Sequence, residues 1–240
     1  MKPVLMVLTL LVLTGCAAGG SHTGDWASSA PSVPACKPLD SDQELVANMA
    51  QQMVEQGQMH AALATLDQLP LALPEVRMRK ARLMRALDMP QAEPLYRSLL
   101  DTCLVAQGKH GLGLLAAARN ELPEAAEQLQ AAVRLAPTDS GMRNDLGVLL
   151  MRQRQLDAAY FELMTALQLS KGGSRAADNL LALLLYQDRW QEAGSVANDY
   201  ALPASRFQAA QAKAERMRQQ DRDASVADAR VASNQLSRLD

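Results

Sequence analysis

The chain has 240 residues, of which 48% are hydrophobic and only 3% aromatic, and its formal net charge is -2. This length and apolar content suffice to bury the core of one or two domains. The near-neutral charge lacks the basic excess that neutralises a phosphate backbone, which argues against nucleic acid as a partner. The apolar residues are mostly Leu, Ala and Met, which favour helices over sheets, so the composition predicts an all-α protein.

The first sixteen residues have the pattern of a targeting segment. Lys2 precedes an apolar run over residues 4–13, which is too short to span a bilayer but suits a signal peptide. The sequence Leu-Thr-Gly-Cys that ends this segment resembles the lipobox of bacterial lipoproteins. The resemblance implies cleavage of residues 1–15 and a lipid such as palmitate on Cys16, which would anchor the chain in a membrane. Ala17 follows instead of Asp and favours the periplasmic face of the outer membrane; an ordinary secretory signal with an incidental cysteine is the alternative.

The segment over residues 16–40 is rich in Gly, Ser, Ala and Pro and shows no helical periodicity. Such a composition predicts a flexible tether with some extended stretches. We therefore expect the folded part of the chain to begin near residue 41.

A repeat with a period of 34 residues begins after this tether. Shifting the chain by 34 places Leu112-Gly113 on Leu146-Gly147, Ala125 on Ala159 and Leu129 on Leu163. This pattern resembles the tetratricopeptide repeat (TPR), a pair of antiparallel helices in which small residues allow close approach. The resemblance implies a right-handed superhelical solenoid of about five hairpins and a capping helix, spanning residues 41–220.

Five hairpins and a cap can be placed along the chain. They are expected at residues 43–74, 75–101, 106–139, 140–173 and 174–200, with the capping helix at residues 203–220. The Gly172-Gly173 pair is expected to stop the fourth hairpin. Residues 221–240 are polar and small, which predicts a frayed helix or disorder.

No catalytic or metal-binding pattern is present in the sequence. The three histidines, His22, His60 and His110, lie far apart, and the chain has no HExxH, CxxC, GxSxG or phosphate-cradling glycine loop. We therefore expect no cofactor, no metal and no small-molecule substrate, and a function other than catalysis.

Two cysteines remain once Cys16 is assigned to the lipid. In an oxidising periplasm Cys36 and Cys103 would form a disulfide that closes a long loop and holds the tether against the repeats. Alternatively, Cys103 is a small buried apolar residue and Cys36 is a free thiol. The sequence does not choose between the two.

The inner face of a TPR solenoid is lined by the first helix of each hairpin, and the repeat alignment predicts which residues lie there. The predicted partner-binding residues are Arg77, Met84, Arg85, His110, Leu114, Asn144, Val148, Met151, Arg152, Asp178 and Tyr186. This mixture of aliphatic surface and arginine donors suits an amphipathic helix or an extended acidic peptide.

The whole layout is similar to two groups of repeat lipoproteins, the pilotins of type IV pili and the TadD-type proteins of the tight-adherence (Flp) pilus. Residues 92–100 and 144–150 look most like the TadD type. The resemblance implies an outer-membrane pilotin that binds a secretin, at a C-terminal helical segment of it, and supports its localisation and assembly. An envelope adaptor that scaffolds peptidoglycan-synthesis or outer-membrane protein-assembly complexes fits the same layout, and an enzyme that uses the repeats as a platform is a third hypothesis.

Overall fold

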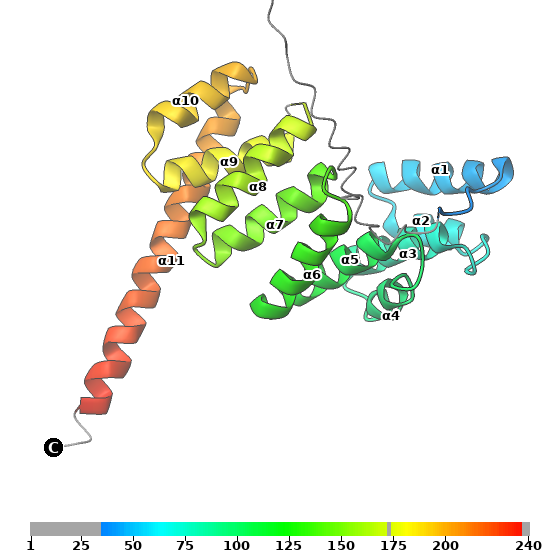
Figure 1. The fold of residues 1–240 in the computed structure, drawn as a ribbon, viewed down its shortest axis with the longest axis horizontal. Helices are drawn as coiled ribbons and strands as arrows, with labels where there is room; N and C mark the ends of the chain where they lie inside the picture. Colours follow the sequence, from blue (N-terminus) through cyan, green and yellow to red (C-terminus); the bar gives the residue numbers. More distant parts are fainter. Residues whose placement is uncertain (1–34, 172–173, 237–240) are drawn as a thin grey trace, which may run out of the picture. The chain divides into compact units, whose positions relative to one another are not determined.

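The computed structural model describes residues 35–171 and 174–236, and every regular element in these ranges is an α-helix (Figure 1). The predicted all-α class is therefore confirmed. The predicted signal peptide, Cys16, the first part of the tether and the Gly172-Gly173 stop lie outside the described residues. None of the described helices is both long and apolar enough to cross a membrane.

The first ten helices pair in sequence into hairpins. They are α1 (Ser41–Glu55) with α2 (Met59–Leu66), α3 (Pro74–Ala86) with α4 (Ala92–Arg97), α5 (Val105–Ala118) with α6 (Leu122–Leu135), α7 (Ser140–Arg152) with α8 (Leu156–Leu169), and α9 (Ser174–Tyr186) with α10 (Trp190–Asp199). These pairs coincide with the five hairpins expected from the repeat, and the solenoid prediction holds. The eleventh helix, α11 (Ala204–Leu236), follows the last pair.

The turn inside each hairpin has the same local structure. A residue with a left-handed backbone follows each first helix, at Gly57, Asp88, Asn120, Arg154 and Asp188, with φ between 53° and 76°. The amide of the next residue then donates to a carbonyl five positions back, as in Gln155 to Leu150 at 2.9 Å. This helix stop leaves room for the second helix to fold back after only a few residues.

Capping side chains and proline start several of the first helices. Asp40 accepts from the Gln43 amide at 2.9 Å, and the Gln43 side chain accepts from the Asp40 amide at 3.2 Å, which makes a capping box at α1. Asp139 caps α7 in the same way through the Met142 amide, and Pro74 opens α3 at a position where its missing N–H costs nothing.

The buried apolar residues form three clusters along the array. One large cluster runs through α5 to α11, a small one joins α1 and α2 to Val76 and Leu83 of α3, and another small one lies within hairpin α3–α4. Inside the large cluster the paired helices touch at glycine, as the repeat predicted. A Cβ on Gly113 would lie 2.7 Å from Leu129 Cγ, and a Cβ on Gly147 would lie 2.7 Å from Leu163 Cγ, so larger residues would push the helices apart.

The capping helix is longer than the sequence indicated. Ala210, Ala214 and Met217 are buried on the expected stripe, and α11 continues past Gln220 to Leu236, into the segment for which the sequence predicted a frayed helix or disorder. Asp221, the first residue of the expected tail, is bound to the repeats by Arg154. Helix α11 packs principally against α9.

Candidate partner-binding site

The predicted inner-face residues do not form one continuous surface on the solenoid. Leu114, Val148 and Arg152 come together in a groove of about 240 Å³ between α5 and α7, here called the central groove. The Arg152 guanidinium is already used there, since it donates to the Ala117 carbonyl at 2.9 Å and to Asn120 Oδ1 at 3.1 Å. This arginine therefore braces two successive hairpins, and the central groove offers mainly aliphatic surface.

Two other predicted contacts are part of a polar ladder that crosses the first helices. His110 Nε2 lies 2.8 Å from Asp145 Oδ2, and Asn144 donates to Asp145 Oδ1 at 3.0 Å. Asn179 of α9 then donates to Asn144 Oδ1 at 2.8 Å, and Lys213 of α11 donates to Asn179 Oδ1 at 2.6 Å. Asn144 is only 6% exposed, so it pairs successive repeats instead of offering a contact to a partner.

The electrostatics of this ladder follow from burial. Burial by itself would raise the pKa of the Asp145 carboxyl, but the hydrogen bonds from His110 and Asn144 hold that pKa below its usual value. At the other end, burial lowers the pKa of the Lys213 ammonium, to which the neighbouring Arg216 also contributes. The ladder is thus a chain of hydrogen-bonded groups that are buried or partly buried.

The last pair of predicted residues in the sequence, Asp178 and Tyr186, is bonded to side chains of α11. Arg206 of α11 donates to Asp178 Oδ1 at 2.7 Å, and the Tyr186 hydroxyl donates to Asp221 Oδ2 at 2.5 Å. Arg154 donates to the same Asp221 carboxylate at 2.6 and 2.9 Å, and its guanidinium stacks over the Tyr186 ring at 5.3 Å. The bonds from Arg154 and Tyr186 lower the pKa of Asp221.

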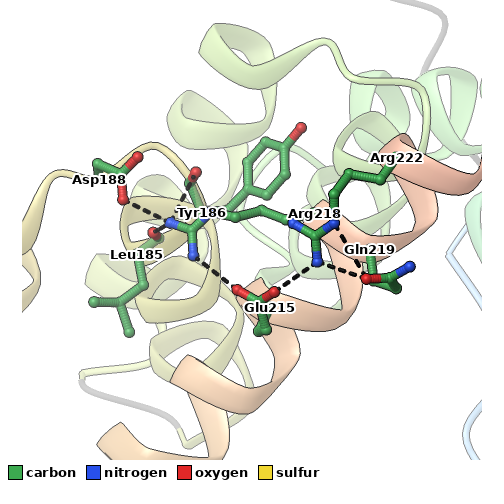
Figure 2. A network of polar contacts seen from close by, with 7 residues as sticks. All are labelled: Leu185, Tyr186, Asp188, Glu215, Arg218, Gln219 and Arg222. Atoms are coloured by element: carbon green, nitrogen blue, oxygen red, sulfur yellow. Dashed lines mark hydrogen bonds and ion pairs between the residues drawn. The ribbon is translucent and has the colours of Figure 1, made fainter. Parts of the chain in front are cut away.

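Figure 2 shows how a second arginine holds α11 on α9. Arg218 donates to the carbonyl of Leu185 and, at 2.7 Å, to the Asp188 carboxylate in the turn after α9. Glu215 lies between Arg218 and Arg222 on α11 and bonds to both, at 3.5 and 2.8 Å. Inner-face positions of α7, among them the buried Met151, share a small pocket with α11 side chains such as Met217. Helix α11 therefore takes up the inner face of the C-terminal hairpins.

At the other end of the array the inner face is open. A groove of about 510 Å³ separates α1 from α3, here called the N-terminal groove. It is lined by Ala47, Asn48, Ala50, Gln51, Val54, Met59, Leu66, Glu75, Met78, Arg79, Arg82, Leu83 and Ala86. Buried apolar side chains form its floor, and exposed polar and charged ones form its rim.

The three residues predicted on α3 do not line this groove. Met84 packs against the apolar cluster of hairpin α3–α4, and Arg77 donates to the Ser98 carbonyl at 2.8 Å. The Nε atoms of Arg77 and Arg85 are buried, and no hydrogen-bond partner lies near them within the described ranges. The repeat alignment predicted the wrong face of α3 for the groove, because the first two hairpins are shorter than the 34-residue repeat and the alignment is out of register there.

The groove residues that the repeat alignment missed are Asn48 and Gln51 on α1 and Arg79 and Arg82 on α3. One signal for α3 was present in the sequence: residues 74–86 hold five basic side chains and one acidic one. Such an excess of positive charge on a single helix indicates a surface that can bind a negatively charged partner. Helix α1 carried no comparable signal.

The two cysteines beyond Cys16 are bonded to each other. Cys36 and Cys103 form a disulfide with their Cα atoms 5.2 Å apart and 67 residues apart in sequence. The bond joins the segment before α1 to the loop between α4 and α5, and so encloses hairpins α1–α2 and α3–α4. Across the described parts of the chain, no group of three or more His, Cys, Asp or Glu side chains is arranged to hold a metal ion.

Comparison with known proteins finds a relative in sequence. No protein-family model matches the chain. A TPR repeat-containing protein of Pseudomonas aeruginosa is 39% identical over 207 residues, which cover 86% of this chain and 82% of the relative.

Solved structures agree in fold at low sequence identity. A thermophilic TPR protein of Thermus thermophilus has a TM-score of 0.60 at 19% identity, over 73% of this chain and 98% of its own. PilF of Pseudomonas aeruginosa has a TM-score of 0.56 at 16% identity, over 73% of this chain and 89% of its own.

Proposed function

The chain belongs to the family of TPR repeat-containing proteins, and from this premise we propose that it is a pilotin-type lipoprotein. It would hold a secretin subunit on its solenoid and support the localisation and assembly of that secretin at the outer membrane for a Tad/Flp pilus. A TPR fold implies protein partners in general, because stacked hairpins present an extended inner face. The secretin, the lipid anchor and the outer membrane are the proposed specifics.

The observation that carries the proposal is the unequal occupation of the inner face. Helix α11 takes up the C-terminal end, while the N-terminal groove of about 510 Å³ is left open between α1 and α3. A binding module needs one open, preformed surface of this kind. Helix α1 is also the first described helix after Cys16 in the sequence, so this is the end of the array that a lipid on Cys16 would tether.

Two features support a location in the cell envelope. The sequence that ends in Cys16 resembles a lipobox, and the Cys36–Cys103 disulfide requires an oxidising compartment such as the periplasm. In the proposed mechanism the lipid on Cys16 fixes the protein to the membrane, and the groove captures a secretin segment. No bond is made or broken, so the function rests on affinity and tethering alone.

The test is a co-purification at native expression with a C-terminal tag and gentle solubilisation of membranes. We expect the secretin to be enriched, and we expect it to lose its outer-membrane localisation in a Cys16→Ser strain. Incorporation of an alkyne-labelled palmitate should disappear in the same variant. Enrichment of peptidoglycan-synthesis or outer-membrane assembly proteins without a secretin would replace the pilotin by the envelope adaptor. Retention of palmitate in Cys16→Ser would contradict the anchor.

A further inference from the structure

We infer that the N-terminal groove binds an amphipathic α-helix that carries acidic side chains. The inference rests on the proposed function in one respect, that this scaffold holds a protein segment. It adds where that segment binds, in which conformation and with which charge.

The first step is the shape and polarity of the groove. Its floor is made by apolar residues that are almost fully covered, such as Ala50 and Leu83, and its rim by exposed polar ones such as Asn48 and Gln51. An apolar floor with a polar rim fits a ligand that has one apolar face and one polar face. An extended chain, by contrast, would need partners for its backbone, and α1 and α3 have already satisfied their own backbone groups.

The second step is the charge. On α3, Arg79 is paired with Glu75 at 2.9 Å and Lys80 with Asp67, so these cations are neutralised within the chain. Nothing in residues 35–171 or 174–236 provides a hydrogen-bond or ion-pair partner for the guanidinium of Arg82. Arg85, three residues further along the same helix, also lacks an ion pair among these residues, but it does not line the groove. The free guanidinium of Arg82 beside an apolar floor favours a carboxylate, which can accept two parallel hydrogen bonds from arginine.

The third step is the conformation of the ligand, which the chain itself illustrates. The same inner face, at its C-terminal end, is occupied by a helix. Helix α11 places Ala210, Ala214 and Met217 against the repeats at spacings of four and three, and Asp221, four residues later, is captured by Arg154. A helix with this apolar stripe and one flanking carboxylate is therefore a ligand that the inner face already accepts in cis.

Two other occupants are distinguishable by experiment. One is the α11 helix of a second copy, whose portion beyond Asp221 carries exposed side chains such as Val226. The other is an anionic lipid surface, which would attract Arg82 without any helix. The charge of α11 is mixed and lipid would not fill an apolar floor flanked by helices, so a separate acidic helix fits the observations best.

The experiment measures binding of two designed peptides to the full-length mature protein in detergent by fluorescence anisotropy. Both peptides have eighteen residues and the apolar stripe of α11; one carries Glu and the other Lys at the flanking positions. We expect the Glu peptide to bind and the Lys peptide to bind at least about tenfold more weakly. Arg82→Glu should weaken the Glu peptide by about tenfold or more, because it removes a charge-assisted contact and adds repulsion.

Two further variants make the site assignment specific. Gln51→Trp enlarges an exposed rim residue and should block both peptides without unfolding the protein. Arg134→Glu makes the same charge change on α6, at an exposed position outside the groove, and should leave binding unchanged. Far-UV circular dichroism checks that each variant folds.

Several outcomes would overturn the inference. Equal binding of the two peptides, unchanged binding with Arg82→Glu or Gln51→Trp, or an equal loss of binding with Arg134→Glu would contradict an acidic helix in this groove. Binding of anionic vesicles but not of the Glu peptide would assign the surface to lipid. An Arg82-dependent dimer in light scattering would assign it to a second copy of the chain. The proposed function fails separately. If the Glu peptide binds at this groove but no secretin co-purifies, the pilotin role is contradicted and the groove assignment stands. If a secretin co-purifies equally well with Arg82→Glu, the groove assignment is contradicted and the pilotin role stands.

Discussion

The two ends of this solenoid use the same repeat for opposite purposes. Hairpins α5–α6, α7–α8 and α9–α10 share one continuous apolar cluster with α11, and α11 packs against α9 at the C-terminal end of the inner face. Hairpins α1–α2 and α3–α4 are held by two small clusters, one of which joins α3 to the first hairpin; they leave the N-terminal groove open and are enclosed by a disulfide. Stability and an open binding surface compete for the same inner-face positions. At the C-terminal end, α11 packs on the repeats and buries apolar side chains. At the N-terminal end no described helix does so, and a disulfide encloses the two hairpins instead.

The largest expected effect comes from breaking this cross-link. Replacing both cysteines, Cys36→Ser with Cys103→Ser, opens a loop of 67 residues, for which the chain-entropy model gives a loss of about 4 kcal/mol. The loss should fall on the N-terminal region. Hydrogen exchange should therefore speed up in residues 41–100 and change little in residues 140–200. A reducing agent should reproduce this pattern in the wild-type protein and do nothing to the double variant; uniform acceleration along the chain would mean that the two regions are not separate.

A pair of identical substitutions tests the junction between the regions. A Cβ on Gly111 would lie 2.2 Å from the ring of Tyr96, which is only 2% exposed and cannot move aside easily. We expect Gly111→Ala to lower the free energy of unfolding by about 2 kcal/mol.

The matched control is Gly194→Ala in α10. No atom lies within 4 Å of a Cβ placed there, so this variant should gain about 0.5–1 kcal/mol of stability from helix propensity. Urea denaturation measures both. The same sign for the two variants would show that packing at Tyr96 is not what requires a glycine.

The contact that closes the C-terminal inner face has a smaller expected effect. Asp221→Asn removes the carboxylate that Arg154 and Tyr186 share, and should cost about 1 kcal/mol, because the side chain is 41% exposed and solvent screens the ion pair. Hydrogen exchange should show α11 loosening on α9 beyond Met217. Gln219→Ala, at an exposed position nearby, is the control; if α11 is equally protected in Asp221→Asn, Asp221 does not fix the helix.

The smallest effect concerns pH and the polar ladder. The folded-state pKa of Asp145 lies below the unfolded value of about 3.9, so its ionised form stabilises the fold above that pH. This contribution is lost as the pH falls through the folded-state pKa. Asp145→Asn should therefore lose less than about 1 kcal/mol at neutral pH and show a shallower decline below about pH 4. The control is Asp101→Asn, at an exposed position outside the ladder, which should keep the wild-type dependence of stability on acid pH in urea denaturation. If Asp145→Asn also keeps the wild-type dependence, the ladder does not contribute to stability through the Asp145 carboxylate.

The sequence by itself determined the helices and their pairing. The Leu-Gly pair at residues 112–113 and its copy at 146–147 predicted which helices touch, because a glycine there is needed whatever surrounds the hairpin. Turns such as those at Asn120 and Arg154 are local structures as well, and they recur with the repeat. Such features depend on residues only a few positions apart, so the order of residues along the chain is sufficient to reveal them.

Only the tertiary structure decided which part of the inner face is open. The alignment treated Asp178 and Tyr186 as binding positions, but α11 returns along α9 and its Arg206 and Asp221 bind them first. The periodicity gave no signal for the contribution of α1 to the N-terminal groove, and the pairing of Cys36 with Cys103 was one of two alternatives. These outcomes depend on side chains that lie tens of residues apart and meet only when the whole array has formed. A repeat pattern specifies the positions that face inward, and long-range packing specifies which of them remain available to a partner.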